Sequence, residues 1–90
     1  MDEGRKLEAQ RHFAGFCQAL RKGYPQAHFA KQYGLTAGAV QDLEQARVLP
    51  SRAVVVLLHA IRMQPEFMQR AAKEAAEDLE LLAELRTGRN

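Results

Sequence analysis

Apolar side chains recur at helical spacing along most of this chain. In the first quarter they stand three or four residues apart, and charged residues fill much of the opposite side. The apolar positions are Leu7, Phe13, Phe16, Cys17 and Leu20. This pattern predicts a first helix over residues 5–22, which Gly23, Tyr24 and Pro25 end.

Two short helices are predicted next, over residues 25–33 and 37–45. Gly34 can adopt the left-handed conformation that ends the first of them. Thr36 offers a hydroxyl as N-cap of the second. We expect Ala39, Val40 and Leu43 of that helix to face inward.

The second half of the chain predicts two longer helices. Ser51 is the expected N-cap of a helix over 52–63, and Pro65 opens a last helix over 65–86. An apolar stripe runs along the last helix for about five turns. Its members are Phe67, Met68, Ala71, Ala72, Ala75, Leu79, Leu82 and Leu85. The predicted fold class is therefore all-α, with about five helices and a long C-terminal helix.

Length and charge refine this picture. A chain of 90 residues has room for one modest core. Residues 1–62 carry nine Lys or Arg against five Asp or Glu, whereas residues 63–90 carry four against six. A polyanion would thus meet the first part of the chain. We divide the chain into a first unit over 1–64, whose basic balance suits a polyanion such as DNA, and a C-terminal amphipathic helix over 65–90.

Residues 26–45 carry the functional signal, because they match the needs of a helix-turn-helix. Ala30 is small where the two helices would cross, and Gly34 tolerates a positive φ in the turn. Val40 and Leu43 supply branched apolar side chains beneath the second helix. In such a motif the outer face of the second helix enters the major groove of DNA.

These residues resemble a known family. Gln26-Ala27, Phe29-Ala30, Gly34-Leu35-Thr36, Val40, Leu43-Glu44-Gln45, Arg47 and Pro50 resemble the lambda-repressor-like (XRE, Cro/C1-type) helix-turn-helix family. Residues 43–50, the Leu57-Leu58…Ile61 helix and Pro65-Glu66 are similar to HigA-type antitoxins. Residues 24–40 are also similar to plasmid KorA/TrfB-type repressors. The family usually has Gly where Ala46 stands, so we expect a mild conformational cost at that residue.

The resemblance implies which side chains touch DNA. The expected base contacts are Thr36, Ala37, Gly38, Gln41 and Gln45, on the outer face of the second motif helix. Glutamine can pair bidentately with adenine in the major groove. The expected phosphate contacts are Gln26, Lys31, Arg47 and Arg52, with Arg21 and Lys22 as weaker candidates. Asp42 would repel phosphates unless it accepts from cytosine or pairs with a neighbouring arginine.

The C-terminal stripe is expected to form a dimer or partner surface. Its expected contact residues are Phe67, Ala71, Ala75, Leu79 and Leu82. A two-fold pair of recognition helices would read a palindromic operator. The resemblance to HigA-type antitoxins implies autoregulation and a toxin protein as a second partner.

Other functions have weaker support in the sequence. No residue set combines a nucleophile, a base and a pocket, so we expect no enzyme, cofactor, metal or small-molecule substrate. Cys17 is expected to be a buried thiol. Because it is the only cysteine, no internal disulfide can form, which favours a reducing, cytoplasmic location. No apolar run approaches the roughly 20 residues of a membrane span, so we expect none. Two alternatives to the antitoxin stay open: a stand-alone phage or plasmid regulator, and a helical adaptor that binds only protein.

Overall fold

The computed structural model describes residues 2–87, and the side chains of residues 2–86. In this range the chain forms six helices and no strand, which confirms the predicted all-α class. The helices are α1 (Glu3–Arg21), α2 (Gln26–Gln32), α3 (Ala37–Glu44), α4 (Arg52–Met63), α5 (Pro65–Glu74) and α6 (Ala76–Thr87). Residues 88–90 of the predicted C-terminal segment lie outside the described range.

The helix boundaries follow local capping chemistry. The hydroxyl of Thr36 accepts from the Ala39 amide at 3.0 Å, and that of Ser51 accepts from the Val54 amide at 3.2 Å. Each hydroxyl satisfies a donor that the first helical turn leaves unpaired. At the other end of α1, Lys22 and Gly23 have positive φ angles of 53° and 86°, so the chain reverses before Pro25. These predicted starts and stops are confirmed.

The core lies where α1, α2, α3 and α4 meet. Its buried cluster consists of Cys17, Phe29, Ala30, Tyr33, Val40, Leu43 and Ile61. Met68 of α5 packs against this cluster, and the Gln69 side chain donates to the Tyr33 hydroxyl at 2.9 Å. The first helix of the C-terminal segment is therefore part of the main body.

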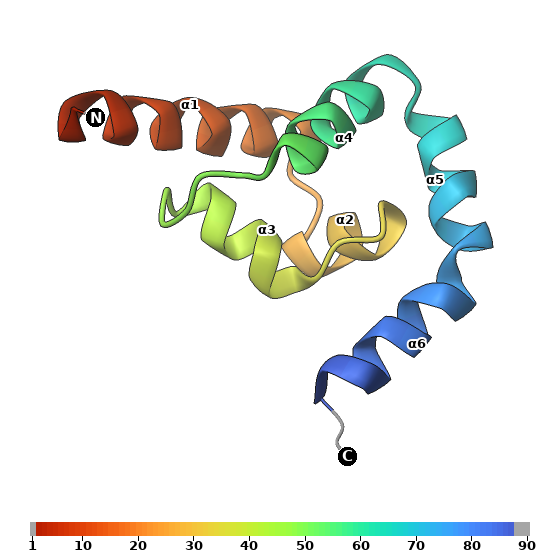
Figure 1. Cartoon of the computed structure of the whole chain (residues 1–90). Helices are drawn as coiled ribbons and strands as arrows, with labels where there is room; N and C mark the ends of the chain where they lie inside the picture. The colour runs from red at the N-terminus through yellow and green to blue at the C-terminus, as the bar shows by residue number, and fades with distance from the viewer. Residues whose placement is uncertain (1, 88–90) are drawn as a thin grey trace.

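The single helix predicted over 65–86 is wrong, because the structure has two helices with a turn at Ala75. Ala75 has φ −85° and ψ 0°, and Figure 1 shows the chain changing direction there. Neither proline nor glycine marks this turn. Beyond the bend, Leu79 of α6 approaches the turn at Gly34, while the described side chains of α6 stay exposed.

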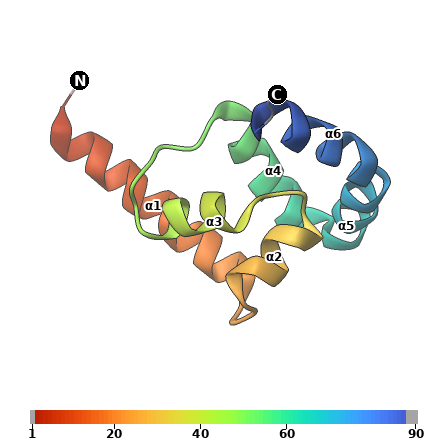
Figure 2. The ribbon, with the colours of Figure 1, turned by 90° about the horizontal axis from the view of Figure 1, so that it is seen from below.

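Side chains of α5 and α6 lie close to Gly34, in the turn between α2 and α3. A Cβ atom placed on Gly34 would lie 3.5 Å from Leu79 Cδ1 and 3.8 Å from Ala72 Cβ. The two C-terminal helices thus touch the turn between α2 and α3, and the views in Figures 1 and 2 show them as an arc beside α2. Within the described residues no helix is long and apolar enough to cross a membrane.

Candidate nucleic-acid interface

The helices α2 and α3 form a helix-turn-helix around Gly34. Gly34 has φ +74°, and the next amide, that of Leu35, donates to the Ala30 carbonyl at 2.9 Å. This 6→1 hydrogen bond closes the end of α2 in the manner of a Schellman motif. Ala30 is buried, so the two helices approach closely where its methyl group lies. The two helices predicted within 26–45 and the turn between them are therefore present.

The outer face of α3 consists mainly of small and amide side chains, together with the carboxylate of Asp42. All five predicted base-contacting residues, Thr36, Ala37, Gly38, Gln41 and Gln45, are exposed. On the inner face Val40 and Leu43 are buried, as predicted. The prediction that Ala39 faces inward is wrong: Ala39 is exposed, and the buried side of α3 consists of Val40, Leu43 and Glu44, at the i, i+3 and i+4 positions.

The C-terminal end of α3 holds an alanine in the left-handed conformation. Ala46 has φ +57°, its amide donates to the Leu43 carbonyl at 3.1 Å, and the Arg47 amide donates to the Asp42 carbonyl at 3.0 Å. This left-handed conformation costs about 1–2 kcal/mol for a residue with a Cβ atom. The positive φ of Ala46 is therefore the physical origin of the conformational cost expected at this residue.

A buried ion pair fixes the same end of α3 to α1 and α2. The guanidinium of Arg21 donates to both carboxylate oxygens of Glu44, with N–O distances of 2.7 Å each. The Gln26 amide donates to Glu44 Oε1 at 3.0 Å. Glu44 is only 9% exposed, so its charge depends on these donors.

The charge of Glu44 also affects its neighbour Cys17. Burial alone would raise the pKa of Glu44, but the hydrogen bonds from Arg21 and Gln26 outweigh it and lower that pKa below its ordinary value. Burial, together with the Glu44 carboxylate, raises the pKa of the Cys17 thiol to about 12. Cys17 is fully buried and remains a thiol at neutral pH, as expected for a structural side chain.

The sequence analysis did not identify this network. Its three polar members lie at the end of α1, the start of α2 and the end of α3, and no local spacing relates them. Arg21, a weaker candidate for a phosphate contact, is instead engaged with Glu44. The amide of Gln26, predicted to contact phosphate, is also held inside the protein.

The remaining predicted phosphate contacts are cations at the surface. Lys31 and Arg52 are exposed and form no ion pair with the described residues. Arg47 lies 3.3 Å from Asp42, and both side chains are well exposed. Such a surface pair contributes little stability, so Arg47 can exchange this partner for a phosphate at small cost.

The helix N-termini differ in charge in a way that matches the motif. The first turns of α1, α5 and α6 contain acidic residues, which is the usual electrostatic complement of a helix dipole. The first turns of α2, α3 and α4 contain none, and α4 begins with Arg52. The first turns of these three helices therefore carry no acidic side chain of their own that would repel a polyanion.

The predicted dimer or partner stripe is divided by the bend at Ala75. Phe67 and Ala71 lie four residues apart on α5 and are exposed, Phe67 by 59%. Ala75 is half-buried, while Leu79 and Leu82 line a groove beside α2. The five residues thus do not form one continuous face.

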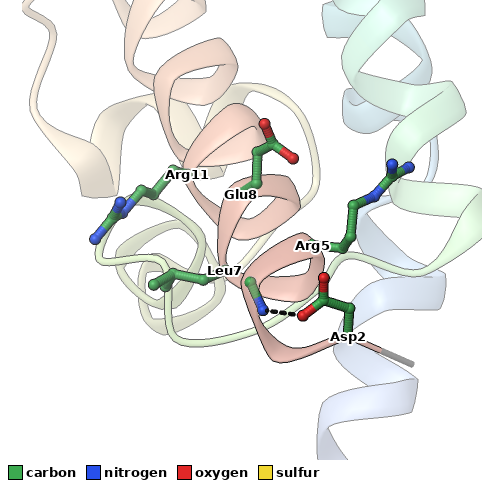
Figure 3. A pocket seen from close by; sticks show the side chains of 6 residues that line it. Asp2, Arg5, Leu7, Glu8 and Arg11 are labelled. Atoms are coloured by element: carbon green, nitrogen blue, oxygen red, sulfur yellow. Dashed lines mark hydrogen bonds between the residues drawn. The ribbon is translucent and has the colours of Figure 1, made fainter.

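A shallow hollow at the start of α1 has no converging polar groups. Figure 3 shows Asp2 capping α1 through its bond to the Gly4 amide, at 2.9 Å, while Arg5 and Arg11 extend in different directions. Among residues 2–87 no group of three or more His, Cys, Asp or Glu side chains is placed to hold a metal ion.

Comparisons of the chain with profiles of protein families, with curated protein sequences and with solved structures gave no match. The functional argument therefore rests on the residues and their geometry.

Proposed function

We propose that this protein is a sequence-specific DNA-binding transcriptional repressor that acts as a homodimer on a palindromic operator, its own operon being the expected target. The observation that carries the proposal is the outer face of α3. Along this face, from Thr36 to Gln45, the exposed side chains are small or amide ones apart from Asp42, whose carboxylate pairs with Arg47. A face of this kind can approach base edges closely and offers two amides for hydrogen bonds in the major groove.

Each exposed residue has a role in this proposal. Gln41 and Gln45 pair with base edges, and Thr36, Ala37 and Gly38 allow the start of α3 to enter the groove. Lys31, Arg47 and Arg52 neutralise phosphates on either side. The buried Glu44 network positions α3 against α1 and makes no DNA contact itself.

Dimerisation in this proposal uses the exposed part of α5. Phe67 and Ala71 present an apolar face directed away from the groove beside α2. A second recognition helix doubles the number of base pairs read and accounts for a palindromic site. A toxin partner of the HigA type stays a prediction from the sequence resemblance.

The proposal is tested by selecting binding sites from random double-stranded DNA, followed by gel shifts at about 150 mM salt, where non-specific binding is weak. We expect enrichment of a palindromic sequence and a discrete shift that a scrambled duplex does not give. If the selection enriches no sequence and the protein shifts all duplexes equally, the repressor proposal is contradicted and the protein-binding adaptor is favoured.

A further inference from the structure

A groove of about 1210 Å³ lies between α2 with its turn on one side and α5 with α6 on the other. Its apolar surface comes from both sides, through Leu35, Ala72, Ala76, Leu79 and Leu82. The groove exists because the chain bends at Ala75 and Leu79 packs over Gly34. It is large enough for a ligand site, and mostly apolar surface with a few polar groups is typical of such sites.

Charged side chains surround this apolar surface, and cations outnumber acids. The cations are Lys31, Arg70, Lys73 and Arg86, and the acids are Glu66 and Glu80. None of the four cations forms an ion pair with any described residue. Four cations without partners around an apolar surface complement a ligand that carries both an apolar body and a negative charge.

We propose that this groove binds a small amphipathic carboxylate, an elongated apolar molecule that ends in one carboxyl group. The apolar body lies along Leu35, Leu79 and Leu82, and the carboxylate accepts hydrogen bonds from Arg70 and Lys73. Four cations against two acids leave these walls with a surplus of positive charge, so an anionic end group is favoured over a neutral or cationic one.

The position of the groove connects the ligand to the recognition helix. Leu35 and Thr36, which line the groove, form the turn and the N-cap of α3. A ligand that bridges this turn and α6 can alter how α3 is presented, provided that its affinity differs between the two arrangements. This regulatory consequence rests on the proposed function, whereas ligand binding itself does not.

The test is isothermal titration calorimetry of the full chain with decanoate, at concentrations where decanoate is monomeric. Decanol and decylamine serve as neutral and cationic probes of the same chain length. We expect decanoate to bind with a Kd below about 1 mM, and the other two to bind at least about tenfold more weakly. Absence of decanoate binding, or equal binding of the three probes, would overturn the proposal.

Two variants locate the binding in the groove. R70Q/K73Q removes two exposed cations, and we expect it to weaken decanoate at least about tenfold. R5Q/K6Q, which removes the same charge from the far end of α1, should leave the Kd within about twofold. L82Q should also weaken decanoate, since it interrupts the apolar surface.

Equal effects of the two charge-neutralising variants would contradict the location. Conversion of a wild-type dimer to monomer by L82Q or R70Q/K73Q would show that a second copy of the chain covers the groove, and would also overturn the proposal. The titration contains no DNA, so failure of the repressor proposal leaves its outcome unaffected.

Discussion

At the scale of single residues, the position of α3 depends on Glu44. Its carboxylate is held by Arg21 of α1 and Gln26 of α2, and the three side chains meet at the C-terminal end of α3. Removal of the carboxylate leaves the donors of Arg21 and Gln26 without their acceptor. Loss of hydrogen bonds to a buried charge costs about 1.5–3 kcal/mol, so Glu44→Gln should destabilise the fold substantially.

This destabilisation should depend on pH in a definite direction. The pKa of Glu44 is lower in the folded protein than its ordinary value of 4.5, so at acidic pH the unfolded chain binds more protons. The stabilisation is fully present above about pH 4.5 and is lost as the pH falls through the folded-state pKa. Urea unfolding should therefore show a gap between wild type and Glu44→Gln that is widest at neutral pH and narrows under acid. Glu8→Gln, at an exposed site on α1, should show no such gap, and a pH-independent gap for Glu44→Gln would contradict the ion-pair assignment.

Ala46 gives a second prediction at the residue scale. Its φ of +57° is costly for alanine and free for glycine, so Ala46→Gly should raise the free energy of unfolding by about 1 kcal/mol. For a domain of this size that corresponds to a rise in Tm of about 4–8 °C. Ala19→Gly, at an exposed helical position in the last turn of α1, should instead lower stability, by up to about 0.5–1 kcal/mol. If Ala46→Gly lowered the free energy of unfolding as Ala19→Gly does, Ala46 would not occupy the left-handed conformation in solution.

At the scale of elements, the C-terminal helices were the least predictable part. Starts and stops marked by Thr36, Ser51, Gly34 and Pro25 follow from local chemistry, and the sequence predicted them. The turn at Ala75 has no such mark, because alanine favours an unbroken helix. Beyond it, Leu79 contacts the turn at Gly34, a residue 45 positions earlier in the chain, and no local pattern relates these two residues.

The face of α5 leads to a prediction about assembly. Phe67 is 59% exposed, so its replacement should leave the fold intact and act on self-association alone. We expect Phe67→Gln to shift the protein from dimer to monomer in sedimentation velocity, and to weaken operator binding at least about tenfold. Leu7→Gln changes an exposed apolar residue at the opposite end of the molecule, and should do neither (Figures 1 and 2). Wild-type protein that remains monomeric at tens of micromolar would contradict dimerisation through α5.

At the scale of the whole molecule, charge and helix polarity point to one interface. The basic part of the chain contains α2, α3 and α4, and these are the three helices whose first turns lack acidic residues. The sequence predicted the exposed positions on α3, because helical periodicity separates Val40 and Leu43 from the outer face. It could not predict that Gln26 and Arg21 bind Glu44, or that a groove forms beside α2, since both arise from contacts between distant segments.

The most direct test of the central claim, that the outer face of α3 reads DNA bases, is the specificity ratio of Gln41→Ala. The ratio is the affinity for the selected site divided by that for a scrambled duplex, measured for wild type, Gln41→Ala and the control Gln64→Ala, whose exposed side chain lies between α4 and α5. Loss of a bidentate base contact, worth about 1–3 kcal/mol, should lower the ratio about 5- to 150-fold for Gln41→Ala, while scrambled DNA binds as before. The control should match wild type. An unchanged ratio for Gln41→Ala, or an equal fall for both variants, would contradict reading of DNA by this face of α3.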